Sequence, residues 1–165
     1  MVKVSVDAMG GDYAPAEPVK GAVEALQESD KIFIYLAGRE DEIRRELKKY
    51  TYPEDRLSIV PASEVIETGE PPVAAIQKKK DSSLVAGLTM VRRGEADAFV
   101  SSGSTGAVLV GGQVIVRKIR GVERAPLAPL IPTEKGVSLL IDCGANVDAR
   151  PAHLVQFAAM GSIYM

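Results

Sequence analysis

The sequence predicts an α/β fold of the three-layer α/β/α type, in which helices cover both faces of a mainly parallel sheet. Short β-branched runs alternate with segments of helical periodicity along the chain. The run IFIYLA at residues 32–37 is apolar throughout, as expected for a strand that is covered on both faces. Turns rich in glycine and small polar residues follow three of the expected strands, which suits tight connections between strands and helices.

Apolar runs mark five to six expected strands. They lie at residues 2–6, 32–37, 57–60, 97–100, 127–131 and 137–141. Between the first two runs, apolar residues fall at i, i+3, i+4 and i+7, which places Val19, Ala22, Val23 and Leu26 on one face of a helix. The same reasoning predicts helices over residues 40–50, 72–80, 82–94, 105–119 and 151–165. We expect these elements to form a single α/β unit over residues 1–165.

Several of these helices carry further signals. The helix over residues 40–50 is strongly charged and has Ile43 and Leu47 as its buried side. The helix over 82–94 has Asp81 or Ser82 as its cap and ends at Gly94. A loop at residues 67–72, with the sequence ETGEPP, precedes the helices in the middle of the chain.

The last helix shows an apolar face and no polar end. Leu154, Phe157, Ala158 and Gly161 lie on that face, and the helix stops without a polar turn or a basic last turn. Carbonyl groups at a helix end need partners, so we expect the natural chain to continue beyond Met165. A helix that packs to its end against another subunit is the alternative.

The composition excludes several classes of protein. The 165 residues are 46% hydrophobic and carry a formal net charge of −2, which disfavours a disordered chain and a generally basic nucleic-acid binder. No run of eighteen apolar residues is present, and the first residues lack the apolar core of a signal peptide. One cysteine and one histidine offer no metal-ligand cluster. We therefore expect a cytoplasmic protein without a metal.

The three glycine turns are the candidate site. They are DAMGGD at residues 7–12, SSGSTG at 101–106 and DCGAN at 142–146. The carboxyl ends of parallel strands share one edge of a sheet, so these turns should meet in one polar crevice with free N–H groups that suit phosphate. Glycines that merely permit tight turns are the alternative reading. Neither a P-loop, a dinucleotide motif nor a G-x-S-x-G elbow is present, and His153 has no obvious acid partner.

Three segments that contain these turns resemble a known family. VDAMGGDYAP, then KKKDSSLVAGL with ADAFVSSGSTGA, and then LLIDCGANVDARPAHLVQFAAMGSIY resemble bacterial phosphate acyltransferase. The resemblance runs through essentially the whole chain and implies the fold of phosphotransacetylases and isopropylmalate dehydrogenases. Family members extend further, so the resemblance also implies that this chain is their amino-terminal half.

The implied reaction transfers a long-chain acyl group from acyl carrier protein to inorganic phosphate. The acyl phosphate product then feeds phospholipid synthesis. Phosphate is itself the nucleophile, so no cofactor and no serine or cysteine nucleophile is expected. The family further implies a homodimer with peripheral membrane association or contact with a downstream membrane acyltransferase, and no nucleic-acid partner. A short-chain phosphotransacetylase and an inactive binding or dimerisation fragment are the alternatives.

The resemblance also suggests roles for individual residues. Those expected to bind phosphate or another part of the substrates are Gly10, Gly11, Gly103, Ser104, Thr105, Gly106 and Gly144. Ser104 stands where many members have asparagine, so a role for that amide does not carry over. Asn146 is expected to donate to the thioester carbonyl, and Asp7 and Asp12 to orient donors or assist proton transfer; capping is the alternative for Asp12.

Other residues have two interpretations each. The basic residues Lys78, Lys79, Lys80, Arg117, Lys118, Arg120 and Arg124 could contact the acidic carrier protein or could be solvated helix ends. Cys143 suits a small buried hydrophobe better than an acyl-thioester intermediate. His153 suits capping or packing better than acid catalysis.

Overall fold

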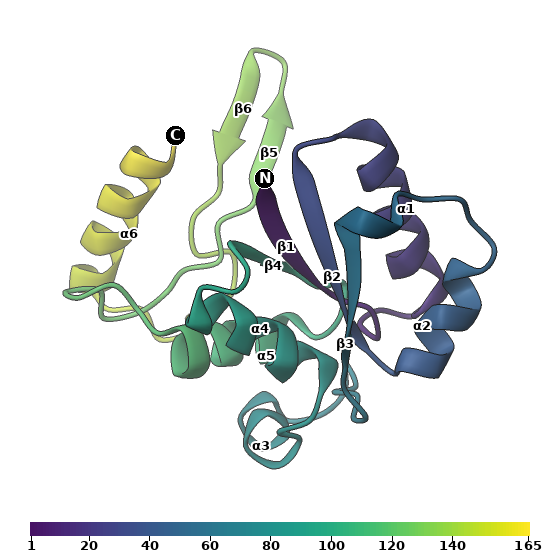
Figure 1. Ribbon diagram of the computed structural model, residues 1–165. Helices are drawn as coiled ribbons and strands as arrows, with labels where there is room; N and C mark the ends of the chain where they lie inside the picture. Colours follow the sequence, from purple (N-terminus) through teal and green to yellow (C-terminus); the bar gives the residue numbers. More distant parts are fainter. The chain divides into compact units, whose positions relative to one another are not determined.

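Two units, Met1–Val116 and Arg117–Met165, make up the computed structural model, which describes all 165 residues. The first unit holds a four-stranded sheet whose strands all run parallel, in the order β3-β2-β1-β4 (Figure 1). These strands are β1 (Val2–Asp7), β2 (Ile32–Gly38), β3 (Leu57–Pro61) and β4 (Ala98–Val100). The expected runs at residues 2–6, 32–37, 57–60 and 97–100 are thus confirmed as its strands.

Helices cover both faces of this sheet. On one face lie α1 (Ala16–Glu28) and α2 (Glu40–Leu47), and on the other lies α4 (Ser83–Arg93), flanked by α3 (Pro72–Lys78) and α5 (Thr105–Gly111) (Figure 1). A short 3-10 helix, Glu54–Arg56, leads into β3. The three-layer α/β architecture expected from the alternating pattern is confirmed.

Each face of the sheet has its own apolar core. Beneath α1 and α2 the buried side chains include Leu36 of β2 and the predicted positions of both helices, which are Val19, Ala22, Val23, Leu26, Ile43 and Leu47. On the opposite face, Ile76 of α3 and Leu84 and Leu88 of α4 pack together with Ala107 of α5. The sheet is therefore covered where its strands are most apolar.

The ends of α4 agree with the predicted signals. Ser82 is the N-cap, and its hydroxyl accepts a hydrogen bond from the N–H of Val85 at 3.4 Å. Gly94 ends the helix in the left-handed region with a φ of 72°. A residue without a side chain is favoured there because a Cβ strains this conformation.

The helix expected over residues 105–119 is shorter than predicted. Its α-helical part ends at Gly111, a π-helical turn follows over Gly112–Val116, and Arg117 leaves the helix with a φ of 78°. Two adjacent glycines weaken the α-helical register at this point. Ile119, expected inside a buried helix, is 80% exposed.

The second unit contains a β-hairpin and one helix. β5 (Leu130–Thr133) and β6 (Gly136–Leu139) form an antiparallel pair. We expected the runs at residues 127–131 and 137–141 to be strands of the parallel sheet, and they are not. Two residues separate these strands, a connection that antiparallel strands accept and parallel strands cannot. Six strands form, as expected, but only four of them belong to the parallel sheet.

The helix α6 (Pro151–Tyr164) forms where predicted, and Phe157 and Gly161 of its predicted face are buried, but Leu154 and Ala158 are not. Its buried residues are His153, Phe157 and Gly161, whereas Leu154 is 57% exposed and Ala158 is exposed as well. Apolar residues surround this helix on all sides, so its sequence does not indicate which face is buried. Neither α6 nor any other helix is both long and apolar enough to span a bilayer.

Candidate functional site

The strand order places a switch point between β1 and β4. From β1 the chain builds outward through β2 and β3, and then returns to add β4 on the other side of β1. Connections that leave in opposite directions open a crevice at the carboxyl ends of the two strands, where ligands bind in open α/β sheets. The turns at residues 7–12 and 101–106 both begin at this point, because they follow β1 and β4.

The two turns are joined by a buried carboxylate. Asp7 is 3% exposed, and its Oδ2 accepts a hydrogen bond from the hydroxyl of Ser101 at 2.8 Å. Its Oδ1 accepts from the N–H of Met9 at 3.2 Å. The hydroxyl of Ser101 in turn accepts from the N–H of Gly103 at 3.0 Å. The predicted meeting of these two turns is therefore confirmed.

Gly10 lets the two backbones approach each other. A Cβ on Gly10 would lie 2.6 Å from Oδ2 of Asp7, 2.8 Å from Oγ of Ser101 and 2.9 Å from the nitrogen of Gly103. The neighbouring Gly11 has a φ of 102°, which side chains rarely tolerate. At both positions glycine is a steric requirement of the contact between the turns.

The first turn of α5 carries open N–H groups. Ser104 is buried, and its hydroxyl caps the helix by accepting from the N–H of Ala107 at 3.3 Å. The N–H groups of Thr105 and Gly106 have no acceptor within the protein, as is usual in a first helical turn. Thr105 is exposed. Backbone donors and a hydroxyl-bearing side chain are thus placed at the edge of the sheet.

A cleft of about 450 Å³ lies beside the first turn. Its walls come from the turn after β1, the start of α2 and the loop that follows β3, and the residues that line it are Met9, Gly11, Asp12, Ala14, Arg39, Glu42, Val65, Ile66, Glu67 and Thr68. Gly11 belongs to this wall and also lies against Ser102 of the second turn, where an added Cβ would come within 3.1 Å of the serine Cβ. The cleft therefore adjoins the meeting point of the two turns. Asp12 is exposed at its rim.

The loop after β3 is held in place by Lys79. The ammonium group of Lys79 donates to the carbonyl of Val65 at 2.6 Å and pairs with the carboxylate of Glu70. The hydrogen bond from Lys79 lowers the pKa of Glu70 from its ordinary value. Three lysines were expected to contact a carrier protein. Of these, Lys79 is instead engaged in contacts within this chain. Lys80 donates to the carbonyl of Ile76 at 3.0 Å, and Lys78 is exposed without such a contact.

The third glycine turn belongs to the second unit and follows β6 of the hairpin. We expected this turn to follow a strand of the parallel sheet, and that expectation is wrong. Asp142 and Gly144 both have positive φ angles, 60° and 83°. The amide of Asn146 closes the turn, because its two N–H bonds reach the carbonyl of Ala125 at 3.1 Å and Oδ1 of Asp142 at 2.9 Å. Cys143 is exposed rather than a buried hydrophobe.

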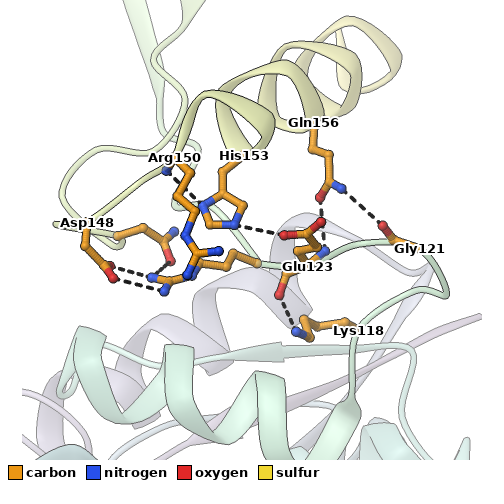
Figure 2. A network of polar contacts seen from close by, with 9 residues as sticks. Lys118, Gly121, Glu123, Asp148, Arg150, His153 and Gln156 are labelled. Atoms are coloured by element: carbon orange, nitrogen blue, oxygen red, sulfur yellow. Dashed lines mark hydrogen bonds and ion pairs between the residues drawn. The ribbon is translucent and has the colours of Figure 1, made fainter.

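A polar network ties α6 to the segment before the hairpin within the second unit (Figure 2). The Nδ1 atom of buried His153 accepts from the backbone N–H of Arg150 at 3.1 Å, which confirms the capping interpretation. Its Nε2 lies 3.0 Å from a carboxylate oxygen of Glu123, an acid partner that the sequence did not indicate. Gln156 accepts from the N–H of Glu123 at 3.0 Å. Lys118 donates to the carbonyl of Glu123.

An ion pair supports the same unit. Arg124 binds the carboxylate of Asp148 through both terminal nitrogens, at 2.6 Å and 3.1 Å. This hydrogen bonding lowers the pKa of Asp148 and raises that of Arg124 from their ordinary values. Arg124 is therefore held by the protein, whereas Arg117 and Arg120 are exposed.

Ser101 lies in a predicted turn, but the sequence indicates no role for its side chain. The structure shows that its hydroxyl contacts Asp7 and Gly103 directly. The signal that was available is its position, because Ser101 is the first residue after β4 and so lies at the carboxyl end of a parallel strand. The neighbouring Asp7 lies 94 residues earlier, so only the pairing of β1 with β4 brings the two together.

Solved structures with a similar fold are phosphotransacetylases. One from Streptococcus pyogenes matches with a TM-score of 0.65 and 20% identity, covering 95% of this chain and 51% of that one. The EutD phosphotransacetylase from Staphylococcus aureus matches with a TM-score of 0.60 and 19% identity over 95% of this chain and 50% of its own. At such identities the likeness shows the fold.

Sequence relatives are more similar. Proteins named phosphate acyltransferase from Clostridium botulinum and Clostridium kluyveri are 49% identical over 163 residues and 50% identical over 161 residues. The alignments cover 99% and 98% of this chain but 49% and 48% of the relatives, so the chain spans about half of their length. The family described as "Fatty acid synthesis protein" matches residues 2–165. The chain belongs to this fatty acid synthesis protein family.

Proposed function

We propose that this chain is the amino-terminal part of a phosphate acyltransferase that transfers a long-chain acyl group from acyl carrier protein to inorganic phosphate. One observation carries the proposal: two glycine turns meet at the switch point of the sheet and leave the N–H groups of Thr105 and Gly106 open. Such donors at a helix start suit a phosphate oxyanion. The relatives named phosphate acyltransferase support the same reaction.

The turns suit a reaction in which phosphate attacks. The hydroxyls of Ser101 and Ser104 are both engaged in hydrogen bonds inside the turns. They therefore stabilise the turns and do not bind substrate. A phosphate oxygen forms the new bond to the thioester carbon, and the carbon–sulfur bond breaks. The thiolate that leaves takes up a proton with little help, since a free thiol has a pKa of about 8.5. The protein therefore needs to hold phosphate in line and to stabilise the oxyanion.

The second substrate needs room beside the phosphate. The cleft of about 450 Å³ supports this part of the proposal, because Gly11 in its wall lies against Ser102 of the turn that would hold phosphate. In the proposal Asp12 at its rim orients donors or assists proton transfer, and Gly144 and Asn146 serve the thioester. Both N–H bonds of the Asn146 amide are engaged within the second unit, so a role in donating to a thioester carbonyl requires the exchange of one of them. Exposed Lys78, Arg117 and Arg120 are the remaining candidates for contact with the acidic carrier.

The test uses the full-length protein that carries this chain, with palmitoyl-acyl carrier protein and inorganic phosphate as substrates. We expect phosphate-dependent release of free carrier thiol together with acyl phosphate trapped as its hydroxamate. Turnover of acetyl-CoA without turnover of the acyl carrier thioester would instead identify a short-chain phosphotransacetylase. Phosphate binding without turnover of either thioester would identify a binding module.

Thr105 provides a variant that tests the phosphate site. We expect Thr105→Ala to raise the KM for phosphate at least tenfold, because one hydrogen bond to an anion is worth roughly 1.5–3 kcal/mol. Thr51→Ala is the matched control, since Thr51 is exposed and its side chain makes no hydrogen bond within the protein. An unchanged KM in Thr105→Ala would remove Thr105 from the site.

A further inference from the structure

We propose that Ser101 is a positioning residue of the phosphate site: its hydroxyl couples the buried carboxylate of Asp7 to the N–H of Gly103 and so fixes the turn that leads into α5. The inference rests on the proposed function and adds a residue that touches neither substrate. Ser101 acts through the turn, whose next residues carry the open N–H groups of Thr105 and Gly106.

The directions of the hydrogen bonds are determined by chemistry. An ionised carboxylate only accepts, so the hydroxyl of Ser101 donates its proton to Oδ2 of Asp7 across 2.8 Å. A backbone N–H only donates, so the same hydroxyl oxygen accepts a hydrogen bond from the N–H of Gly103 across 3.0 Å. A group that both donates and accepts is therefore required at position 101. Serine supplies both functions in one atom.

Burial makes the link important. Asp7 is 3% exposed and forms no ion pair, so its carboxylate depends on the hydrogen bonds from Ser101 and from the N–H of Met9. Hydrogen bonds away from water are stronger, and unpaired polar groups there are correspondingly unfavourable. Loss of the Ser101 hydroxyl leaves two groups without their partner, an oxygen of Asp7 and the N–H of Gly103.

The surrounding backbone is packed tightly around the same three groups. Oδ2 of Asp7, Oγ of Ser101 and the nitrogen of Gly103 would all lie within 2.9 Å of a Cβ on Gly10. A Cβ on Gly103 would likewise lie 3.2 Å from the Cα of Gly10. The distance between the two turns is therefore fixed by this packing, and the hydroxyl of Ser101 lies between their contacting groups.

The N–H groups of the turn and of the start of α5 have two different roles. The N–H of Gly103 is already paired with Ser101, so it stabilises the turn, whereas those of Thr105 and Gly106 remain for an anion. A positioning role for Ser101 then predicts a selective defect. Its loss should weaken the use of phosphate and leave the KM for the acyl carrier substrate unchanged.

The experiment compares Ser101→Ala and Ser101→Thr with the wild-type full-length protein. We expect Ser101→Ala to raise the KM for phosphate at least tenfold and to speed amide hydrogen exchange at Gly103 at least tenfold. Ser101→Thr keeps the hydroxyl and should stay within threefold of wild type in both measurements. Ser102→Ala is the matched control, because Ser102 is the exposed neighbour whose side chain makes no hydrogen bond within the protein.

A second control separates positioning from general loss of stability. Ser82 is fully buried, and its hydroxyl donates to the carbonyl of Lys79 at 2.8 Å and caps α4. Ser82→Ala should therefore lower the melting temperature without raising the KM for phosphate. An equal rise in both alanine variants would overturn the inference, and so would a wild-type KM in Ser101→Ala.

The outcome can be distinguished from failure of the proposed function. If the wild-type protein does not turn over palmitoyl-acyl carrier protein, the acyl transfer proposal fails. Titration with inorganic phosphate then tests whether Ser101 positions the turn. We then expect phosphate to protect the amides of Thr105 and Gly106 from exchange, at concentrations at least tenfold higher in Ser101→Ala. Absence of protection in the wild type, or equal protection in both proteins, would overturn the inference.

Discussion

Gly10 shows at the scale of one residue how the site depends on close backbone contact. The residue is buried, and the space that a methyl group would need is occupied by Asp7, Ser101 and Gly103. The nitrogen of Gly103 is backbone, and the two side-chain oxygens are hydrogen-bonded to each other, so none of the three can move aside freely. The glycine is therefore required by packing.

Gly10→Ala should destabilise the protein by about 1–3 kcal/mol, the usual effect of forcing extra atoms into a packed interior. Gly21→Ala is the control: Gly21 lies in α1 with open space around it, so alanine should stabilise the helix by about 0.5–1 kcal/mol. Urea unfolding of both variants measures the difference. Equal stability of Gly10→Ala and wild type would show that the turns can move apart.

The sequence allowed Asp7, Gly10 and Gly103 to be placed together, because ends of neighbouring parallel strands meet at one edge. It did not reveal Ser101, because its partner Asp7 is 94 residues away and the order of strands is not written in the periodicity. Nor did it show that the amide of Asn146 is engaged with Ala125 and Asp142. Contacts of that kind depend on the exact path of a loop.

At the scale of elements, the loop after β3 is joined to the start of α4 by Asp81. Its carboxylate accepts from both the N–H of Ser63, at 2.9 Å, and the hydroxyl of Ser63. The N–H of Asp81 donates to the carboxylate of Glu64 at 3.0 Å. These contacts precede the part of the loop, Val65 to Thr68, that lines the cleft.

The hydrogen bonds from Ser63 lower the pKa of Asp81 from its ordinary value. The folded state therefore binds this proton less readily than the unfolded state, whose carboxyl has a pKa of about 3.9. The stabilisation is present above that pH and is lost as the pH falls through the lowered value. Asp81→Asn should accordingly melt below wild type at pH 6, with the difference shrinking as the pH falls below about 4. A difference that does not depend on pH would contradict this origin.

The elements of the first unit were predictable because its strands and helices have long, regular patterns. The hairpin of the second unit was not, because four-residue strands carry no period that separates antiparallel from parallel pairing. The signal that was available is the short connection Thr133-Glu134-Lys135-Gly136, with a φ of 132° at its glycine. Two short apolar runs joined by a turn that contains glycine favour a hairpin.

At the scale of the whole molecule, the two units differ in how much they bury. Both apolar cores lie within residues 1–116, on the two faces of the parallel sheet. In residues 117–165 only His153, Phe157 and Gly161 are buried. Chains of about this size seldom bury enough surface to be stable alone, and Cys143 is the only cysteine, so no internal disulfide can help.

Residues 1–116 expressed alone should therefore fold with a cooperative thermal transition and a dispersed amide spectrum. Residues 117–165 alone should show neither, because their apolar side chains remain largely in water. Circular dichroism and proton NMR of the two pieces provide the measurement. A noncooperative transition in residues 1–116 would show that the two cores require the second unit.

The pairing of β1 with β4 has a consequence for the order in which the protein is made. β1, β2 and β3 are synthesised first and can pair with their neighbours as they emerge, whereas Asp7 must wait for Ser101, 94 residues later. Contacts so far apart in sequence form slowly because a long loop has to close. A nascent chain that has only its first three strands therefore lacks the contact between the two turns. The proposed phosphate site would form in a single late step, when the fourth strand docks.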